Sequence, residues 1–326
     1  MVMSSFRIKA IAKSVPQKVV TNDDLTKIME TSDEWIKRRT GIAQRHIATT
    51  ESNTSMCVDV AKQLVNQAGI DVNQIDYIIV ATMSGDYQTP STAASVQGSI
   101  GASHAVAFDI DAACSGFVYG SSVMNTLLAG KKDSIGIVIG GEKLSRLVNW
   151  HDRGTAVLFG DGAAGILVQN DGSDSQILGE NLSTFGEAGM SLTAGHHAGQ
   201  NPFGENHDQD DQFLQMDGHA VYNFATKRVP ESIEQAVKAA GIELSDIKYF
   251  VMHQANERIV KRVAKKLSLS MNKFPVNIHN YGNTAAASEP ILLAELAEQG
   301  RLHRGDYLAL TGFGGGLTVG TIVIKY

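Results

Sequence analysis

The sequence is poor in the residues that mark disulfide-linked or nucleic-acid-binding proteins. Its 326 residues include only two cysteines, Cys57 and Cys114. No disulfide framework is implied, and we expect a reduced, cytoplasmic setting. Basic residues number 28 against 34 acidic ones, which gives a net charge of −6. An acidic chain is a poor candidate for binding nucleic acid, so we expect no nucleic-acid partner.

Long apolar runs are also missing. Residues 1–16 contain no extended apolar stretch and no cleavage signal, and we expect no membrane partner. The longest uncharged stretch near the middle, Ala112–Gly130, is interrupted by serine, asparagine and threonine. This pattern is typical of a helix buried in a folded core, not of a membrane span.

Two similar segments recur at one fixed spacing. Residues 69–80 run from Gly69 through an acidic turn into an apolar strand, and residues 241–252 repeat the pattern 172 positions later. The same offset carries residues 134–140 onto residues 306–312. Two matches at one offset indicate an internal duplication, and each half then has an ordinary domain size.

Within each half, helices alternate with short apolar strands. Helices are expected at Asp59–Ala68 and Ser232–Ala240, each just before a strand. Such alternation predicts an α/β fold with mostly parallel sheets. We expect an N-terminal half, residues 1–172, and a C-terminal half, residues 173–326, sharing a central helical layer that includes Ala112–Gly130. Residues 187–212, rich in glycine, histidine, asparagine and aspartate, are expected to form a long surface loop.

Cys114 is the candidate nucleophile. It lies where an apolar strand turns into the buried helix. Unpaired N–H groups and the positive dipole end of the helix should favour the thiolate and can hold an oxyanion. A lone cysteine is more often an inert core residue, and we interpret Cys57, on an ordinary helical stretch, in that way.

Two further polar residues stand at related strand-to-helix junctions. His253 directly follows an apolar strand, and Asn283 precedes Ala286, the position that matches Cys114 at the 172-residue offset. Ligand sites in α/β sheets gather at the carboxyl ends of strands. Alone, either residue is more often structural, but the three junctions together favour a catalytic site.

Other motifs have weaker meanings. Residues 311–317 are rich in glycine but lack the lysine and hydroxyl residue of a phosphate-binding loop, so we expect a turn whose backbone approaches a substrate. Phe159–Ala164 is expected to be a turn between buried strands. The pair His196 and His197 has no cysteine or carboxylate at metal-ligand spacing, so no metal site is predicted.

One helix is strongly basic. Residues 257–267 carry Arg258, Lys261, Arg262, Lys265 and Lys266 against a single acid. A solvated surface helix is the ordinary explanation. Because this cluster begins close after His253 in an acidic protein, we also expect an acidic macromolecular partner to dock here.

The chain resembles the β-ketoacyl-acyl carrier protein synthase III family of the thiolase superfamily. The resemblance covers nearly the whole chain and rests on several specific motifs. These are residues 31–36 (TSDEWI), 39–42 (RTGI), 112–117 (AACSGF), 152–155 (DRGT), 159–163 (FGDGA), 253–256 (HQAN), 281–288 (YGNTAAAS) and 312–316 (GFGGG). Cysteine with histidine and asparagine separates this family from elongating synthases, which pair cysteine with two histidines, and from thiolases.

The resemblance implies a duplicated five-layer αβαβα fold and a homodimer. It also implies a decarboxylative Claisen condensation that starts fatty-acid synthesis, with coenzyme A thioester as substrate and no further cofactor. Cys114 would take the acyl group from acyl-CoA, and His253 and Asn283 would stabilise the enolate formed from malonyl-acyl carrier protein. Backbone N–H groups of Cys114 and Gly315 would form the oxyanion hole.

The resemblance assigns further binding residues. Trp35 and Arg153 would sandwich the adenine, Arg39 would lie near the nucleotide, Asn256 and Asn283 would point into the pocket, and Phe313 would orient the nucleophile region. The basic helix would dock acyl carrier protein, with Gln254, Arg258, Arg262 and Lys265 as the expected contacts.

Three positions depart from common family residues: Asn223 where lysine is frequent, Val319 where many members have tryptophan, and Thr89 where phenylalanine is frequent. By resemblance, Thr89 reaches the acyl pocket of the dimer partner, so the primer could be acetyl-CoA or a somewhat longer acyl-CoA. Three alternatives stay open: another thiolase-fold acyltransferase, a papain-like cysteine hydrolase, and a non-catalytic subunit. The retained Cys114 speaks against the last, and the duplication speaks against the second.

Overall fold

The computed structural model describes residues 5–196 and 212–326. Its first sheet has the strand order β1-β7-β6-β4-β5. These strands are β1 (Arg7–Ser14), β4 (Tyr77–Ala81), β5 (Val106–Ile110), β6 (Ile135–Glu142) and β7 (Gly162–Gln169). The second sheet has the order β11-β12-β13-β8. Its strands are β8 (Ile177–Thr184), β11 (Ile247–Met252), β12 (Tyr307–Gly314) and β13 (Thr318–Lys325).

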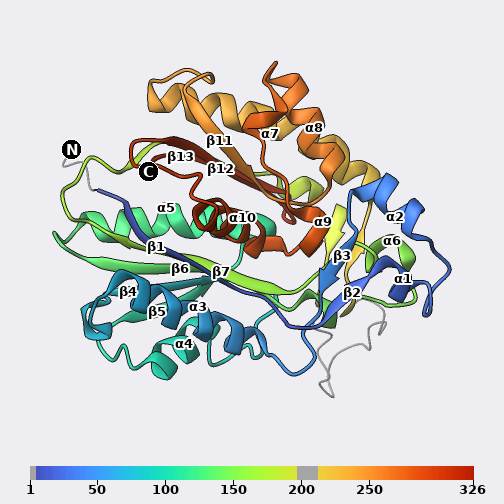
Figure 1. The fold of residues 1–326 in the computed structure, drawn as a ribbon, viewed down its shortest axis with the longest axis horizontal. Helices are drawn as coiled ribbons and strands as arrows, with labels where there is room; N and C mark the ends of the chain where they lie inside the picture. The colour runs from blue at the N-terminus through green and yellow to red at the C-terminus, as the bar shows by residue number, and fades with distance from the viewer. Residues whose placement is uncertain (1–4, 197–211) are drawn as a thin grey trace.

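Helices form three layers around the two sheets (Figure 1). The main helices are α3 (Asn53–Ala68), α4 (Thr92–Ile100), α5 (Gly116–Ala129), α7 (Gly218–Ala240), α8 (Glu257–Lys266) and α10 (Ser288–Glu298). Helices α5 and α10 lie between the sheets, α3 and α4 cover the outer face of the first, and α7 and α8 cover the second. The predicted five-layer α/β arrangement with its central helical layer is confirmed.

Three apolar cores correspond to these layers. The central core joins both sheets through Phe117 of α5 and Leu293 of α10. The two outer cores lie under α3 and α4 and under α7 and α8. The predicted helix at Ser232–Ala240 is the end of the longer α7, and the one at Asp59–Ala68 begins earlier, after the Ser52 N-cap.

The prediction of mostly parallel sheets is wrong. Strands β6 and β5 run parallel to β4, and β11 runs parallel to β12, whereas β7, β1, β13 and β8 pair antiparallel. Strands β12 and β13 are joined by three residues, and so short a connection can only make an antiparallel pair. Their continuous apolar sequences reflect burial on both faces, which either strand direction permits.

Elements that match at the 172-residue offset also meet in space. A 3-10 turn, Ala113–Ser115, precedes α5, and its counterpart Ala285–Ala287 precedes α10. Each turn packs on the central strand of the other sheet: a Cβ on Gly140 of β6 would lie 2.0 Å from the Ala286 carbonyl oxygen, and one on Gly312 of β12 would lie 2.7 Å from Ser115 Cα. Glycine is needed at both places because the backbones touch.

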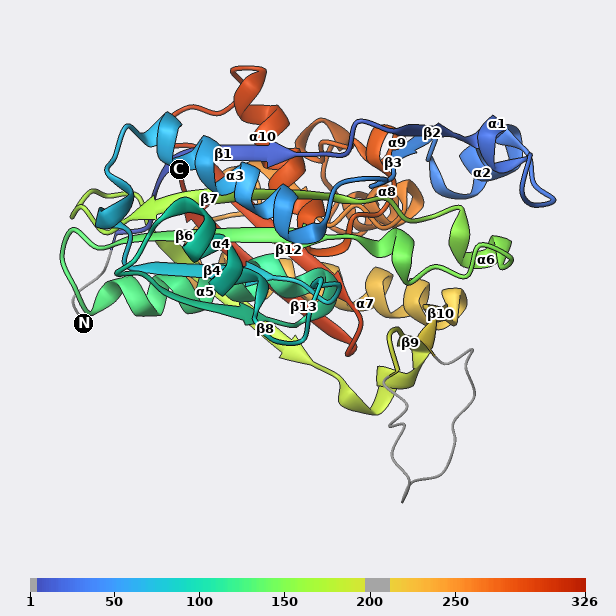
Figure 2. The same cartoon turned by 90° about the horizontal axis from the view of Figure 1, so that it is seen from below.

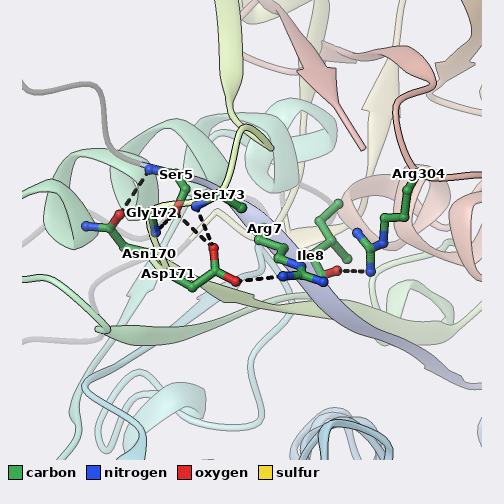
Figure 3. Close-up of polar contacts among 8 residues, drawn as sticks. All are labelled: Ser5, Arg7, Ile8, Asn170, Asp171, Gly172, Ser173 and Arg304. Carbon is green, nitrogen blue, oxygen red and sulfur yellow. Dashed lines mark hydrogen bonds and ion pairs between the residues drawn. The ribbon is translucent and has the colours of Figure 1, made fainter.

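The connection between the sheets is tied to the N-terminal strand (Figure 3). The Ser5 N–H donates to Asn170 Oδ1 at 3.0 Å, and Arg7 pairs with Asp171 at 3.0 Å. From the C-terminal part of the chain, Arg304 donates to the Ile8 carbonyl at 2.8 Å. These contacts hold both sheets to one strand at the end of the molecule where both termini lie (Figures 1 and 2).

Small elements gather at the opposite end in both views (Figures 1 and 2). They are α1 (Asn22–Leu25), α2 (Asp33–Thr40), α6 (Arg153–Ala156), α9 (Ile278–Tyr281), β2 (Val19–Thr21) and β3 (Gln44–His46). A short hairpin, β9 (Leu192–Thr193) with β10 (Gln215–Met216), borders residues 197–211. The predicted loop at 187–212 therefore begins with structure, a 3-10 helix at Gly186–Ser191, and His197 lies outside the described residues.

Short connections fit the sequence patterns in part. Phe159–Ala164 follows helix α6 and not a strand, and its last residues already belong to β7. The glycine-rich residues 311–317 form the end of β12 and the turn into β13, as expected. Across the described residues, every helix is too short or too polar to span a bilayer.

Candidate active site

Cys114 sits in a strained turn between β5 and α5. Ala113 has φ 46°, a left-handed conformation that costs a non-glycine residue free energy. Its N–H is held by Asp111 Oδ1 at 2.9 Å. The turn leaves Cys114 6% exposed, facing a cavity and not the bulk solvent.

The expected effect of the helix terminus on Cys114 is present, but burial outweighs it. Burial raises the pKa of the Cys114 thiol well above its usual value, and the carboxyls of Glu142 and Glu289 act in the same direction. The backbone N–H groups of Cys114 and Gly315 lower that pKa, but by less. Loss of hydration outweighs the helix terminus because the whole side chain is desolvated.

The end of β12 lies directly against the nucleophile. A Cβ on Gly314 would stand 2.7 Å from Cys114 Cβ and 2.8 Å from its Sγ, so only glycine fits. This contact brings the Gly315 N–H to the sulfur. Both backbone donors predicted for the oxyanion hole therefore act on the Cys114 thiol.

His253 follows β11 and is almost fully buried. Its backbone N–H donates to the Thr311 carbonyl at 2.8 Å, which ties it to β12. The imidazole lies edge-on to Phe313, with ring centroids 5.1 Å apart. Burial lowers the pKa of His253 to about 3, against a weaker opposing hydrogen bond from the imidazole to the Ala285 backbone, so the ring is neutral at neutral pH. In the described part of the chain its Nδ1 has no hydrogen-bond partner.

Asn283 occupies the matching position in the second half, but the element before it is the short helix α9 and not the expected strand. Its Oδ1 accepts the N–H of Ala285 at 2.9 Å, and Ala285 has φ 42°. The Asn283 backbone is fixed by hydrogen bonds to the Leu158 carbonyl, 2.8 Å, and from the Gly160 N–H, 2.9 Å. Because the side-chain oxygen is occupied, the amide NH₂ is the group that Asn283 offers to the cavity it lines.

One cavity of about 1090 Å³ brings these groups together. Its walls include all three candidate catalytic residues, both predicted pocket residues and the glycine-rich turn. These are Cys114, His253, Asn283, Asn256, Phe313, Gly314, Gly315 and Gly316. The cavity thus combines a thiol, a neutral imidazole and a primary amide with backbone N–H donors, and all three side chains are largely buried.

Trp35, Arg39 and Arg153 meet on the surface where α2 and α6 adjoin. The guanidinium carbons of Arg39 and Arg153 each lie 5.5 Å from the Trp35 ring centroid. Arg153 also donates to the Glu30 carbonyl at 2.9 Å. The expected clustering of the three side chains is found, while their contact with a nucleotide stays a prediction.

Asn256 has a structural task as well as a place in the cavity wall. Its Oδ1 caps α8 by accepting the Arg258 N–H at 2.9 Å, and its Nδ2 donates to the Arg39 carbonyl at 3.1 Å. The residue therefore joins the basic helix α8 to α2.

Gln254 is not available for carrier-protein docking. It is 2% exposed, its Nε2 donates to the Met252 carbonyl at 2.8 Å, and its Oε1 accepts the Asn277 N–H at 3.2 Å. The side chain satisfies backbone groups at the end of β11, which requires burial. The other expected contacts, Arg258, Arg262 and Lys265, are exposed on α8.

The three departing positions have different surroundings. Thr89 is exposed and lies outside the walls of its own chain's cavity, although Tyr87 and Gln88 contribute to them. Asn223 is exposed on α7, beside His219 at 3.2 Å. Val319 is buried in β13 in the outer core that also contains Phe313.

Two buried acids near the thiol were missed by sequence reasoning. Glu142 accepts hydrogen bonds from Ser84 and from the Met83 N–H, and burial raises its pKa to about 8. Glu289 has no hydrogen-bond partner within the described residues, and burial raises its pKa well above the usual value. The only sequence signal was a lone acid in an apolar setting.

Comparisons with known proteins match this geometry to one family. The family models for 3-oxoacyl-[acyl-carrier-protein] synthase III match residues 108–186 and, for its C-terminal part, residues 237–326. The synthase III of Lactobacillus helveticus is 54% identical and that of Levilactobacillus brevis 50%, each covering 100% of both chains. The crystal structure of synthase III from Aquifex aeolicus is 38% identical, with a TM-score of 0.92 over 99% of this chain and 100% of that one.

Proposed function

The chain belongs to the β-ketoacyl-[acyl-carrier-protein] synthase III family, and we propose that it condenses an acyl-CoA primer with malonyl-acyl carrier protein. The product is a 3-oxoacyl-acyl carrier protein, and the reaction initiates fatty-acid synthesis. The observation that carries this proposal is the shared cavity, in which Cys114, His253 and Asn283 face one space. Family membership also argues against the papain-like hydrolase.

In the first half-reaction, the Cys114 sulfur attacks the thioester carbonyl of acyl-CoA. A sulfur–carbon bond forms, the bond to coenzyme A breaks, and the thiol proton leaves with the departing coenzyme A thiolate. The N–H groups of Cys114 and Gly315 stabilise the oxyanion of the tetrahedral intermediate. Their action on the Cys114 thiol supports this role.

In the second half-reaction, malonyl-acyl carrier protein loses CO₂ and its electron pair moves into the thioester as an enolate. Neutral His253 and the Asn283 amide donate hydrogen bonds to the enolate oxygen. The depressed pKa of His253 supports a neutral donor. The enolate carbon attacks the acyl-Cys114 carbonyl and releases the thiolate. Hydrogen bonds can stabilise the enolate, so we propose neither metal nor cofactor.

The substrates enter from the end of the molecule formed by α2, α6 and α8. We propose that Trp35, Arg39 and Arg153 bind the coenzyme A nucleotide, since the two guanidiniums already stack on the indole. Exposed Arg258, Arg262 and Lys265 on α8 face the acidic acyl carrier protein. Asn256 connects the two surfaces through the Arg39 carbonyl.

We propose a cytoplasmic homodimer with two similar halves, residues 1–172 and 173–326. Within the described residues, β5 pairs with β4 on one side only, and Val106 on it is 57% exposed. An unpaired edge of this kind suits pairing with a second copy. Tyr87 is 71% exposed and shares a loop with Thr89 that would face the partner. Both cysteines are free and buried, which suits a reduced compartment.

The test is to incubate the protein with a panel of acyl-CoAs and weigh the peptide that contains Cys114. We expect one acyl group on Cys114 and none on buried Cys57, followed by 3-oxoacyl product when malonyl-acyl carrier protein is added. Cys114→Ala should lose acylation and condensation but keep some malonyl decarboxylation. Condensation at the parent rate in Cys114→Ala would overturn the proposal.

A further inference from the structure

Arg45, on β3, is fully buried without an acidic partner. Its guanidinium donates to Asn22 Oδ1 at 2.8 Å, to the Val157 carbonyl at 2.8 Å and to the Val20 carbonyl at 3.3 Å. Among the described residues no carboxylate pairs with it, and its Nε has no hydrogen-bond partner. Burial lowers its pKa to about 10, so it stays cationic at neutral pH. A buried charge held only by neutral oxygens is costly, which calls for an explanation.

The carbonyl bound by Arg45 begins the segment that holds Asn283. Directly after Val157, the Leu158 carbonyl accepts the Asn283 N–H at 2.8 Å. Two residues later, the Gly160 N–H donates to the Asn283 carbonyl at 2.9 Å. Phe159 and Asn283 thus form an isolated parallel bridge. The backbone of Asn283 has its position set by residues 158–160.

The side chain of Arg45 also packs beneath this bridge. A Cβ on Gly160 would lie 3.1 Å from Arg45 Cβ, and a Cβ on Gly282 would lie 3.4 Å from it. The same hypothetical atoms would lie 2.2 Å from the Tyr281 carbonyl oxygen and 2.8 Å from that of Leu158. The two paired segments and the arginine stem leave no spare volume, so a displacement of residues 158–160 moves Asn283.

We propose that Arg45 is a positioning residue, which aims the Asn283 amide into the cavity by fixing residues 157–160. This inference rests on the proposed function, in which that amide stabilises the enolate. Arginine suits the task because its planar fork can bind oxygens of several elements at once. A misplacement of about 1 Å can cost about 10²-fold in rate, so a small backbone shift is enough to matter.

The first experiment separates the half-reactions in Arg45→Lys. Lysine keeps the charge but cannot span Asn22 and Val157 together. We expect kcat for malonyl decarboxylation to fall by about ten- to a hundredfold, with KM and the rate of Cys114 acylation nearly unchanged. Arg7→Lys, at the opposite end of the molecule, is the matched control and should change neither half-reaction.

The second experiment asks whether the effect passes through Asn283. In an Asn283→Ala background, Arg45→Lys should add little further loss of decarboxylation, because coupled residues are not additive. Full additivity of the two losses, or an equal loss of acylation and decarboxylation in Arg45→Lys, would overturn the proposal.

Hydrogen exchange gives a readout that does not need activity. In Arg45→Lys, the amides of Gly160 and Asn283 should exchange faster than in the parent, while those of α5 should not. If the parent fails to condense substrates yet these amides respond, the proposed function falls and the positioning role stands. If Arg45→Lys does not fold, Asn22→Ala removes one acceptor of the guanidinium and should give a smaller effect on the same amides; unchanged exchange there would refute the inference.

Discussion

The turns that precede α5 and α10 share one backbone conformation and carry different chemistry. In the first half, Asp111 accepts the Ala113 N–H at 2.9 Å and Ala113 has φ 46°. In the second, Asn283 accepts the Ala285 N–H at 2.9 Å and Ala285 has φ 42°. In the first half the nucleophile is Cys114, the residue after Ala113, whereas in the second half the candidate amide donor is Asn283 itself, at the place of Asp111. The same strained turn thus presents a nucleophile in one half and an amide donor in the other.

The element before each turn accounts for the difference in burial. The first turn follows β5, an edge strand, and Asp111 is exposed. At the matching place the second half has the short helix α9, and Asn283 instead pairs with Phe159 of the first half. Both Asp111 and Asn283 line the cavity, but Asn283 is only 7% exposed.

The helices beside the two turns differ in charge. Helix α4, after β4, has no charged residue, whereas α8, after β11, has five basic residues and one acid. Of these two matching helices, α8 alone presents a cationic surface.

The largest expected effect on catalysis comes from giving the second turn the aspartate of the first. Asn283→Asp keeps an oxygen for the Ala285 N–H but removes the amide donor. We expect malonyl decarboxylation, followed as CO₂ release, to fall by about 10²–10³-fold. Asp111→Asn, the mirror change in the first half, keeps the turn and should alter acylation little. Decarboxylation at the parent rate in Asn283→Asp would remove Asn283 from the proposed mechanism.

The buried acid of the first half, Glu142, has no counterpart at the matching position of the second. Glu142 matches Gly314, which has no side chain, at the 172-residue offset. Its pKa is raised from 4.5 to about 8, so the folded chain keeps a proton that the unfolded chain releases. Its stabilising contribution is present below pH 4.5 and is lost as the pH rises towards 8. The loss is about 1.4 kcal/mol per pH unit at most.

Glu142→Gln should therefore flatten the fall in unfolding free energy between pH 5 and pH 8, measured by urea denaturation. His253 has the opposite dependence, because its pKa is lowered to about 3 and stability is lost as the pH falls below 6.5. The contribution of His253 to stability is the same in parent and variant, so it drops out of the difference between their unfolding free energies. An unchanged pH slope in the variant would show that Glu142 is already ionised in the folded chain.

Reversing one charge on the basic helix should have a smaller effect. We expect Arg258→Glu to raise KM for malonyl-acyl carrier protein about tenfold, which corresponds to about 1.4 kcal/mol, and to weaken its dependence on salt. Acylation by acyl-CoA should be unaffected. Lys62→Glu, on α3 in the other outer layer, is the matched control. Equal damage to both half-reactions would indicate the wrong docking surface.

The smallest expected effect concerns primer preference and comes from Thr89, in the loop after β4. If Thr89 leaves room at the end of the partner's acyl pocket, each buried CH₂ of a longer primer gains about 0.8 kcal/mol. Thr89→Phe should then shift the ranking of kcat/KM from longer primers towards acetyl-CoA. An unchanged ranking in a folded, dimeric variant would mean that residues such as Tyr87 or Leu192 already fill this space.

Local patterns in the sequence were enough to predict the shared central helical layer and to single out Cys114, His253 and Asn283, which line one cavity. The five-layer order followed from the family resemblance. Helix α5, the basic α8 and the clustering of Trp35 with two arginines also follow from local sequence or motif. Local sequence did not predict the direction of β7 and β13, the burial of Gln254 or the partners of Arg45. Each depends on segments that lie far apart in the chain and meet only after folding.

The ionisation of the Cys114 thiol depends on both local sequence and tertiary structure. Its place before a helix is a property of residues 108–117, and that place alone favours the thiolate. Whether water reaches the sulfur depends on β12, β6 and α10, which enclose it with Gly314, Glu142 and Glu289. Local sequence determines which groups stand next to each other along the chain. The free energy of a charge depends on everything packed around it, and only the tertiary structure decides that.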